Sequence, residues 1–231
     1  MILSIDTTTN VCSAALLNGE LSVECYQIEN GNHIQMLPNY IQKLIIFAHK
    51  NNITIDAIAL SMGPGSYTGL RIGTAMAKGL SYSMNIPLLA ISTLKLLSFQ
   101  AISKCKEKAI YIPMIDARRM EVYTACYSSE LECLISDHSK IIDDNSFSDI
   151  LNNSKVYFFG NGSTKCRDII KHPNAEFIDD IVPLASYMGK LSNEALLKKD
   201  FVNIAYFAPF YLKEFQATIS HKSQDVLYKK N

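Results

Sequence analysis

The first part of the chain alternates short apolar runs with polar turns, a pattern that predicts three antiparallel strands. Apolar residues fill 2–5, a polar turn follows, and further strands are expected over 12–17 and 21–28. Between the second and third strands stands Asn18-Gly19, the kind of dipeptide that favours a two-residue hairpin turn. Short apolar runs bounded by turn residues are typical of buried strands.

Beyond residue 30 the apolar residues recur every three to four positions, which is typical of amphipathic helices. This pattern predicts helices over 34–50, 68–84 and 93–103, with strands over 55–61 and 87–91 between them. Strands that alternate with helices in this way indicate a parallel arrangement in one sheet.

The opening pattern restarts near the middle of the chain. A strand over 110–116 ends in Asp116 as the first strand ends at Asp6, and an outgoing strand is expected over 121–127. Because this offset of 110 residues is nearly half the chain, two similar halves are expected.

The second half is less regular. A strand is expected over 156–159, and a helix over 183–199 with Pro183 in its first turn. Lys222, Lys229 and Lys230 near the C-terminus are interpreted as a solvated tail rather than a nucleic-acid-binding arm.

The order strand, Asp turn, hairpin strands, helix, strand, helix is that of a ribonuclease H-like unit. We therefore expect an α/β fold of two ribonuclease H-like lobes, 1–104 and 105–231, in the architecture of actin-like ATPases and sugar kinases. The last helix is expected to be able to pack back on the first lobe. In that architecture the Asp turns of both lobes face nucleotide phosphates.

Four residues are therefore candidate nucleotide or phosphate neighbours: Asp6, Asp116, Arg118 and Arg119. The alternative for the aspartates is that each caps its own turn. The alternative for the arginines is that they are solvated turn residues paired with Glu121.

A glycine-rich run, Gly63-Pro64-Gly65-Ser66-Tyr67-Thr68-Gly69, joins the strand over 55–61 to the helix over 68–84. It lacks the Lys of a P-loop, and its glycine spacing is one residue too long for a dinucleotide loop. Free N–H groups at a helix start attract anions. The simpler interpretation is a tight turn whose glycines serve packing.

Composition narrows the classes further. The 231 residues are 48% apolar and carry 22 basic and 22 acidic side chains, so no protein-wide charge favours nucleic acid. No apolar run has membrane-spanning length and no basic leader precedes one, so a cytoplasmic protein is expected. The six cysteines show no C-x-x-C and the five histidines no H-x-x-x-H or H-E-x-x-H spacing, so no metal site is expected.

An ordered series of motifs resembles the TsaB (YeaZ) family, partner proteins in making the threonylcarbamoyl modification on adenosine 37 of tRNA. The series includes Ile5-Asp6-Thr7-Thr8, the run from Gly63 to Gly73, and Asp116-Ala117-Arg118-Arg119. The chain departs from the family pattern in having Ile34 and Gln35 after His33. It also has Lys213 where the family usually carries Arg, and Lys does not replace Arg in a bidentate contact.

The resemblance implies a non-catalytic partner that binds and activates the TsaD transferase, in an assembly with the ATPase TsaE. The sister family TsaD carries an H-x-x-x-H metal-binding helix, whereas here Leu37 stands four residues after His33. No catalytic residue and no tightly bound cofactor are therefore expected, although ATP or ADP is compatible with the assembled complex. The resemblance also implies a homodimer when TsaD is absent and contact with tRNA only through the complex.

Two alternatives stay open at this point. One is a stand-alone nucleotide-dependent transferase of the actin and sugar-kinase fold, which both Asp turns would suit. The other is a peptidase, which no G-x-S-x-G or H-E-x-x-H motif supports.

If the chemistry lies elsewhere, the function of the chain lies in a surface. The helices over 34–50 and 68–84 are expected to form it, because the first has a core-facing apolar stripe with Ile34, Ile45 and Ile46 outside it. The second has small residues every four positions, which let another helix approach closely. The residues expected at the partner interface are Leu37, Tyr40, Ile41, Leu44, Gly69, Leu70, Gly73, Met76, Ala77 and Leu80.

Overall fold

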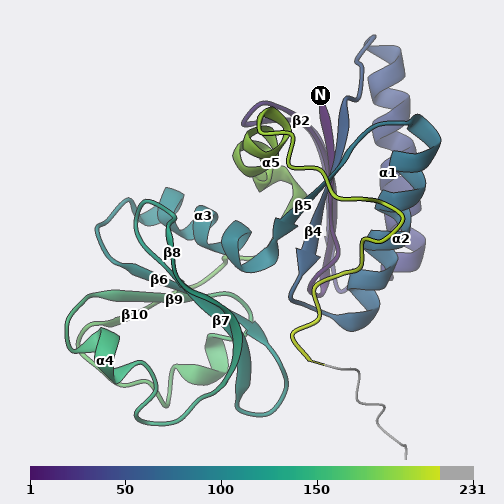
Figure 1. Ribbon diagram of the computed structural model, residues 1–231. Helices are drawn as coiled ribbons and strands as arrows, with labels where there is room; N and C mark the ends of the chain where they lie inside the picture. Colours follow the sequence, from purple (N-terminus) through teal and green to yellow (C-terminus); the bar gives the residue numbers. More distant parts are fainter. Residues whose placement is uncertain (214–231) are drawn as a thin grey trace, which may run out of the picture.

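The structure is a computed structural model that describes residues 1–213 of the 231-residue chain. The predicted C-terminal tail with Lys222, Lys229 and Lys230 lies outside the described residues. The described chain forms two lobes, each built on one five-stranded sheet (Figure 1).

The first lobe is a mixed sheet with helices on both faces. Its strands are β1 (Ile2–Asp6), β2 (Val11–Asn18), β3 (Leu21–Glu29), β4 (Ala57–Gly63) and β5 (Leu88–Ser92), in the order β3-β2-β1-β4-β5. The first three strands pair antiparallel, whereas β4 is parallel to β1 and β5 to β4. Helices α1 (His33–Lys50) and α2 (Tyr67–Met84) cover one face, and α5 (Gly189–Leu197), preceded by the 3-10 turn η2 (Ala185–Tyr187), covers the other (Figure 1).

The second lobe repeats this topology. Its strands are β6 (Ile110–Asp116), β7 (Glu121–Tyr127), β8 (Cys133–Ile141), β9 (Val156–Phe159) and β10 (Ala175–Ile178). Read from the other edge, their order is β8-β7-β6-β9-β10, with the same antiparallel and parallel pairings as in the first sheet. The short helices α4 (Ser148–Leu151) and η1 (Thr164–Cys166) complete this lobe. Two ribonuclease H-like lobes are thereby confirmed as the fold class.

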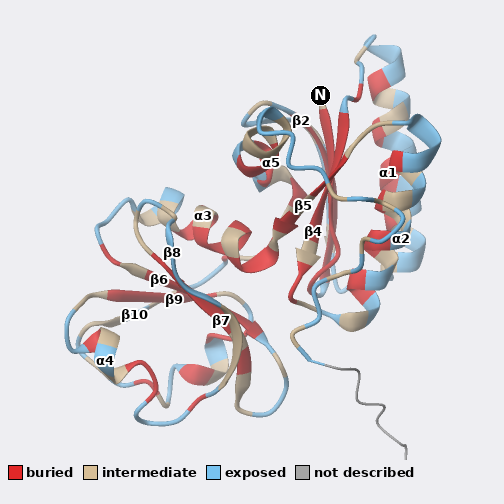
Figure 2. Ribbon diagram, viewed as in Figure 1, coloured by how far each residue is buried: buried red, intermediate tan, exposed pale blue. Residues whose placement is uncertain are grey.

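Helix α3 (Thr93–Cys105) joins the lobes and is buried along most of its length (Figure 2). Leu94, Leu97 and Ala101 pack into the core of the second sheet, whereas Leu96 packs into the core of the first. A helix that shares both cores links the two sheets by apolar burial.

Residues 201–213, the C-terminal strap, return across α2 toward the second lobe (Figure 1). Three of the contacts that hold the strap are hydrogen bonds: Val202 N to Leu88 O, Lys78 Nζ to Phe207 O and Phe210 N to Met62 O, at 3.0, 3.0 and 2.8 Å. The Tyr211 ring packs on the Tyr67 ring with centroids 5.1 Å apart. Finally Lys213 forms an ion pair with Glu121 of β7.

The sequence pattern placed the start of one predicted helix too early and was silent on two strands. The helix expected from Pro183 begins only at Gly189, after an irregular stretch and the 3-10 turn. The strands β8 and β10 were not predicted, because they lie at sheet edges and are largely exposed or half-buried. Within residues 1–213 no helix is both long and apolar enough to cross a membrane.

Candidate functional site

The first Asp turn, which follows β1, is buried inside the first lobe. The Asp6 side chain is fully buried, and its Oδ1 accepts hydrogen bonds from the Thr8 backbone N–H and the Thr8 hydroxyl, both at 3.0 Å. Its Oδ2 has no hydrogen-bond partner within the described chain. Burial raises the pKa of Asp6 to about 6, and the polar groups of Ser61, Thr8 and His33 offset this only in part.

The glycine run covers this turn. A Cβ built on Gly65 would lie 2.4 Å from Thr8 O, and one built on Gly69 only 1.9 Å from Thr7 O. Ser66 N donates to Thr8 O at 2.7 Å, while the Ser66 side chain caps α2 by accepting from Gly69 N. Only glycine allows backbones to approach this closely. The run therefore packs α2 against the Asp6 turn. This agrees with the simpler interpretation of the sequence, a tight turn whose glycines serve packing.

His33 connects the start of α1 to the turn after β1. Its Nδ1 lies 3.1 Å from Gly31 O and its Nε2 lies 3.0 Å from Thr9 O. Both ring nitrogens therefore lie within hydrogen-bond distance of a backbone carbonyl oxygen, and whichever nitrogen carries the proton donates to its neighbour. One helical turn later Leu37 is fully buried in the core, so this helix start provides no pair of metal ligands. Among residues 1–213, no group of three His, Cys, Asp or Glu side chains converges on a metal position.

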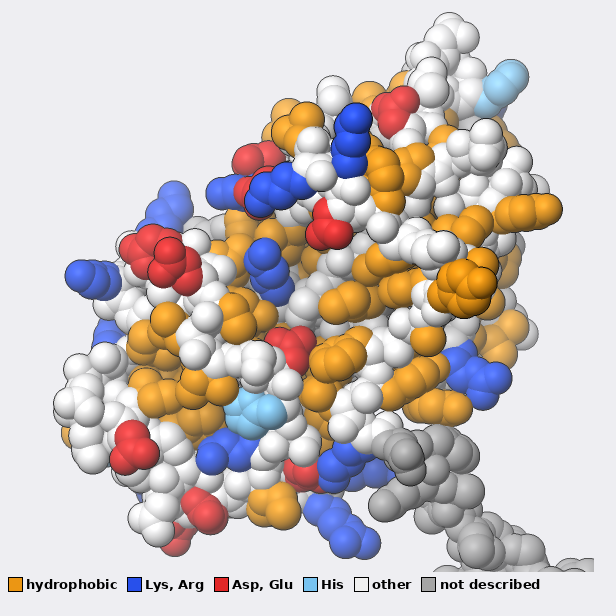
Figure 3. Space-filling view, in the orientation of Figure 1, with side chains coloured by type: hydrophobic (Ala, Val, Ile, Leu, Met, Phe, Trp, Pro, Cys, Tyr) orange, Lys and Arg blue, Asp and Glu red, His pale blue; other side chains and the backbone are white. Residues whose placement is uncertain are grey.

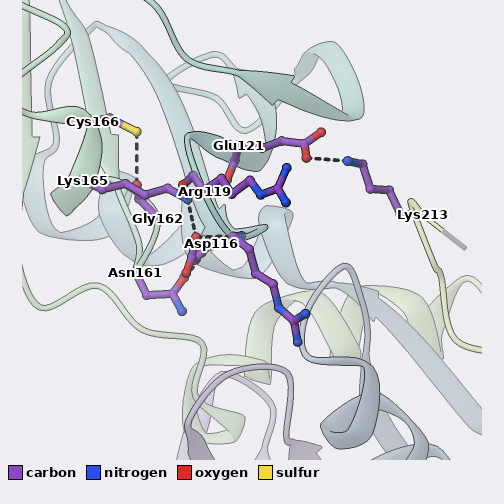
Figure 4. A network of polar contacts seen from close by, with 9 residues as sticks. Asp116, Arg119, Glu121, Asn161, Gly162, Lys165, Cys166 and Lys213 are labelled. Atoms are coloured by element: carbon purple, nitrogen blue, oxygen red, sulfur yellow. Dashed lines mark hydrogen bonds and ion pairs between the residues drawn. The ribbon is translucent and has the colours of Figure 1, made fainter. Parts of the chain in front are cut away.

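The second Asp turn is held by a lysine that the sequence reasoning missed (Figure 4). Lys165 forms an ion pair with Asp116 Oδ1, and its ammonium also donates to Arg119 O and Glu121 O, each at 2.7 Å. Lys165 follows β9 by six residues and lies in the 3-10 helix η1, within the loop that begins at Gly160. No motif in the sequence marks it, because its role depends on how this loop packs against the turn.

These two turns do not fit a magnesium–phosphate group. Asp6 is buried beneath the glycine run, and the Asp116 carboxylate already has an ammonium group from its own chain. Carboxylates that hold Mg²⁺ need free oxygens facing the metal. Arg118 and Arg119, by contrast, are exposed beside the second turn. The geometry gives Asp6 and Asp116 a structural role, and a nucleotide contact by any of the four stays a prediction.

Most of the residues expected at the partner interface face the protein's own core. On α1 this concerns Leu37, Tyr40, Ile41 and Leu44, and on α2 Gly69, Leu70, Gly73 and Ala77, all of them buried. Met76 and Leu80 are half-buried between the helices and the core. The residue assignment needs correction for the buried set, because the small-residue stripe of α2 packs on Thr7 and Leu60 rather than facing outward.

The outward face of α2 carries a different small-residue pair. Ala75 and Gly79 are exposed, and a Cβ built on Gly79 would meet nothing within 4 Å. One turn further on, Tyr82 is 80% exposed. On α1 the exposed apolar residues are Ile34 and Ile46, two of those outside the core-facing stripe. These exposed positions of α1 and α2 are called the outer helix face below.

A family model described as TsaD, tRNA N6-adenosine threonylcarbamoyltransferase, matches residues 27–221. The chain belongs to this family. Similar curated proteins include TsaB proteins, named for tRNA threonylcarbamoyladenosine biosynthesis. The one from Haemophilus influenzae is 27% identical over 92% of this chain and 93% of its own length. The one from Escherichia coli is 34% identical, over 56% of this chain and 55% of its own length.

Solved structures agree with this assignment. YeaZ from Pseudomonas aeruginosa is 26% identical, with a TM-score of 0.74 and coverage of 91% of this chain and 99% of that one. A second Pseudomonas aeruginosa structure, described as similar to peptidase YeaZ, has a TM-score of 0.78 at 26% identity. The resemblance to the TsaB (YeaZ) family is thus confirmed, and the chain is a member of a family of threonylcarbamoyladenosine biosynthesis.

Proposed function

We propose that this chain is a cytoplasmic, non-catalytic partner protein in the threonylcarbamoylation of tRNA, and that it binds a TsaD-type transferase through the outer helix face. In the proposed assembly, which includes the ATPase TsaE, any ATP or ADP is held by the other subunits. The closed Asp6 turn and the Lys165-paired Asp116 favour this role over a stand-alone nucleotide-dependent transferase.

The observation that supports the proposal is the open space around Gly79 of α2. A glycine inside a helix costs about 1 kcal/mol relative to alanine, and such a cost needs a compensating close approach. Gly65, Gly69 and Gly73 each have one within the chain, whereas Gly79 has none among residues 1–213. A helix of a partner that packs directly over Ala75 and Gly79 would supply it, with the exposed Tyr82 as an apolar neighbour one turn further along α2.

The same face would serve a homodimer when the transferase is absent. A two-fold contact uses one surface on both subunits, so transferase and second copy would compete for it. Formation of the heterodimer with the transferase is then expected to reduce the amount of homodimer.

The test is Gly79→Leu, examined by size-exclusion chromatography with light scattering, alone and mixed with TsaD from the same organism. The open space at Gly79 leaves the fold intact, and leucine is the better helix former, so the variant should be more stable but should not form the complex. Gly73→Leu would not test the interface, because a Cβ there would lie 2.4 Å from Thr7 Oγ1 and disturb the fold.

The matched control is Ser103→Leu, which adds the same side chain at an exposed position of α3. It should leave the complex unchanged. A stable Gly79→Leu variant that still forms a one-to-one complex with TsaD would overturn the proposed interface. Wild-type protein that forms no complex and turns over ATP alone would overturn the partner role.

A further inference from the structure

The turn between β6 and β7 carries two unpartnered arginines in a backbone conformation that disfavours them. Arg118 and Arg119 have φ values of 70° and 49°, so two successive residues lie in the left-handed region. Turns with two positive φ values favour Asn and Gly, and the β2–β3 hairpin of this protein places Gly19 at its positive φ of 58°. A non-glycine residue in this region costs about 1–2 kcal/mol. Two long cationic side chains held in this unfavourable conformation point to a function for the arginines.

The surrounding contacts fix the turn without using either guanidinium. The Arg118 backbone N–H donates to Asp116 Oδ1 at 3.0 Å, and Arg119 O accepts from Lys165 Nζ at 2.7 Å. Neither guanidinium has an ion pair or hydrogen bond within residues 1–213, and both side chains are exposed. Figure 4 has dashed lines from Lys165 to Asp116, from Lys213 to Glu121 and from Cys166 to Gly162, and none reaches the Arg119 guanidinium.

The acidic groups next to the turn are already neutralised. Asp116 is paired with Lys165, and Glu121 with Lys213. The alternative in which Arg118 and Arg119 pair with Glu121 is therefore not what the structure has, because Lys213 of the C-terminal strap pairs with that carboxylate. The two guanidinium groups remain as the net positive charge of this surface. Figure 3 shows Lys and Arg side chains gathered along this edge of the molecule, near the end of the described chain.

We propose that Arg118 and Arg119 form a clamp for phosphate groups of an RNA strand, so that this subunit touches the RNA substrate directly. The inference rests on the proposed function only in that the complex acts on tRNA. Guanidinium forks match phosphate oxygens in bidentate geometry. A rigid turn that holds two of them outward needs no reordering when it binds. The half-buried Tyr123 of β7, close to Arg118, adds aromatic surface of the kind on which unpaired bases stack.

The test measures tRNA affinity as a function of salt, for the complex with TsaD and for the isolated chain. The variant Arg118→Gly/Arg119→Gly suits the backbone, because glycine accepts positive φ without strain. It should fold at least as stably as the wild type. At about 0.15 M salt it should bind tRNA roughly tenfold or more weakly, and the slope of log affinity against log salt should fall by between about one and two.

The matched control is Lys106→Gly/Lys199→Gly. These two exposed lysines also have positive φ, 55° and 56°, so this variant loses the same charge with the same backbone relief at a different place. It should leave both affinity and slope unchanged. Arg118→Lys/Arg119→Lys keeps the charge, so it should retain most of the salt slope while losing the bidentate part of the affinity.

Each outcome decides the inference. Weaker tRNA binding and a smaller slope in the Arg-to-Gly variant alone, with assembly intact, would support it. Unchanged tRNA affinity would overturn it, and so would displacement of tRNA from this surface by millimolar ATP, which would indicate a nucleotide site. Loss of TsaD binding with unchanged tRNA binding by the isolated chain would also overturn it and assign the arginines to an acidic protein surface. If wild-type complex fails to form, the proposed function fails, while the isolated chain still tests the clamp.

Discussion

Gly69 packs so closely on Thr7 that a Cβ built on the glycine would lie 1.9 Å from the Thr7 carbonyl oxygen. The Thr7 hydroxyl in turn donates to Gly69 O at 2.7 Å. This pair fixes the N-terminus of α2 on the turn after β1. Because the protein's own backbone occupies the space beside Gly65 and Gly69, this loop has no room for a phosphate at that point.

The two kinds of glycine in α2 should respond oppositely to alanine. Gly69→Ala should destabilise the fold by about 2 kcal/mol, because a backbone oxygen occupies the place of the methyl group and cannot move cheaply. Gly79→Ala should stabilise it by about 1 kcal/mol, since its Cβ enters open space and alanine is the better helix former. Urea unfolding of both variants measures the difference. Equal effects of the two substitutions would contradict the packing described for α2.

Lys165 is predicted to be a stability residue of the second lobe. Lys165→Met keeps the length of the side chain but removes an ion pair with Asp116 and two hydrogen bonds to backbone carbonyls. The pair is partly exposed, so the expected loss is moderate, about 1–2 kcal/mol in the free energy of unfolding. Lys171→Met, at an exposed lysine of the same lobe, is the control and should change the stability little. If the two variants unfold alike, Lys165 does not hold the turn.

The Glu121–Lys213 ion pair should couple the C-terminal strap to the second lobe. Glu121→Lys and Lys213→Glu each place two like charges together, whereas the double variant restores opposite charges. A double-mutant cycle should give a coupling of up to about 1 kcal/mol that weakens at high salt, because Lys213 is largely exposed. Proteolysis within the strap offers a second readout, faster in each single variant than in the double one. A coupling that salt does not change would argue against an ion pair.

Much of the fold could be predicted from the sequence because the central strands of both sheets are buried on both faces. β6 and β7 were placed with the bounds Ile110–Asp116 and Glu121–Tyr127, since long apolar runs ending in turn residues have few alternatives. The repeat of Asp6 at Asp116 correctly predicted two lobes of one topology. The exposed edge strand β8 gave no such pattern.

The candidate site was harder to predict, for reasons of orientation and of distant contacts. A stripe of small residues shows that something approaches closely but does not show from which side, so Gly69 and Gly73 were assigned to a partner instead of to Thr7. The spacing of Ala75 and Gly79 was equally visible in the sequence. Lys165 and Lys213 reach the second Asp turn from 49 and 92 residues beyond their partners Asp116 and Glu121, and no local pattern encodes such pairs.

The buried Asp6 should make stability depend on pH. Its pKa in the folded protein, about 6, lies above the ordinary value of 3.8, because burial penalises the carboxylate. The folded state therefore holds this proton more tightly than the unfolded chain. The stabilising contribution is fully present below about pH 4 and is lost as the pH rises through about 6, a decrease of about 3 kcal/mol if Asp6 acts alone.

Asp6→Asn should remove this dependence. The Asn oxygen can accept the two hydrogen bonds from Thr8 in place of Oδ1, and a neutral amide avoids the cost of burying a charge. The variant should match the wild type near pH 4 and exceed its stability at pH 7.5, as measured by urea unfolding across this range. Asp168→Asn, at an exposed aspartate, should keep the wild-type pH profile. If Asp6→Asn is instead less stable than the wild type at pH 7.5, the turn requires a buried carboxylate, and the unpartnered Oδ2 then faces a cation or donor that the fold itself does not supply.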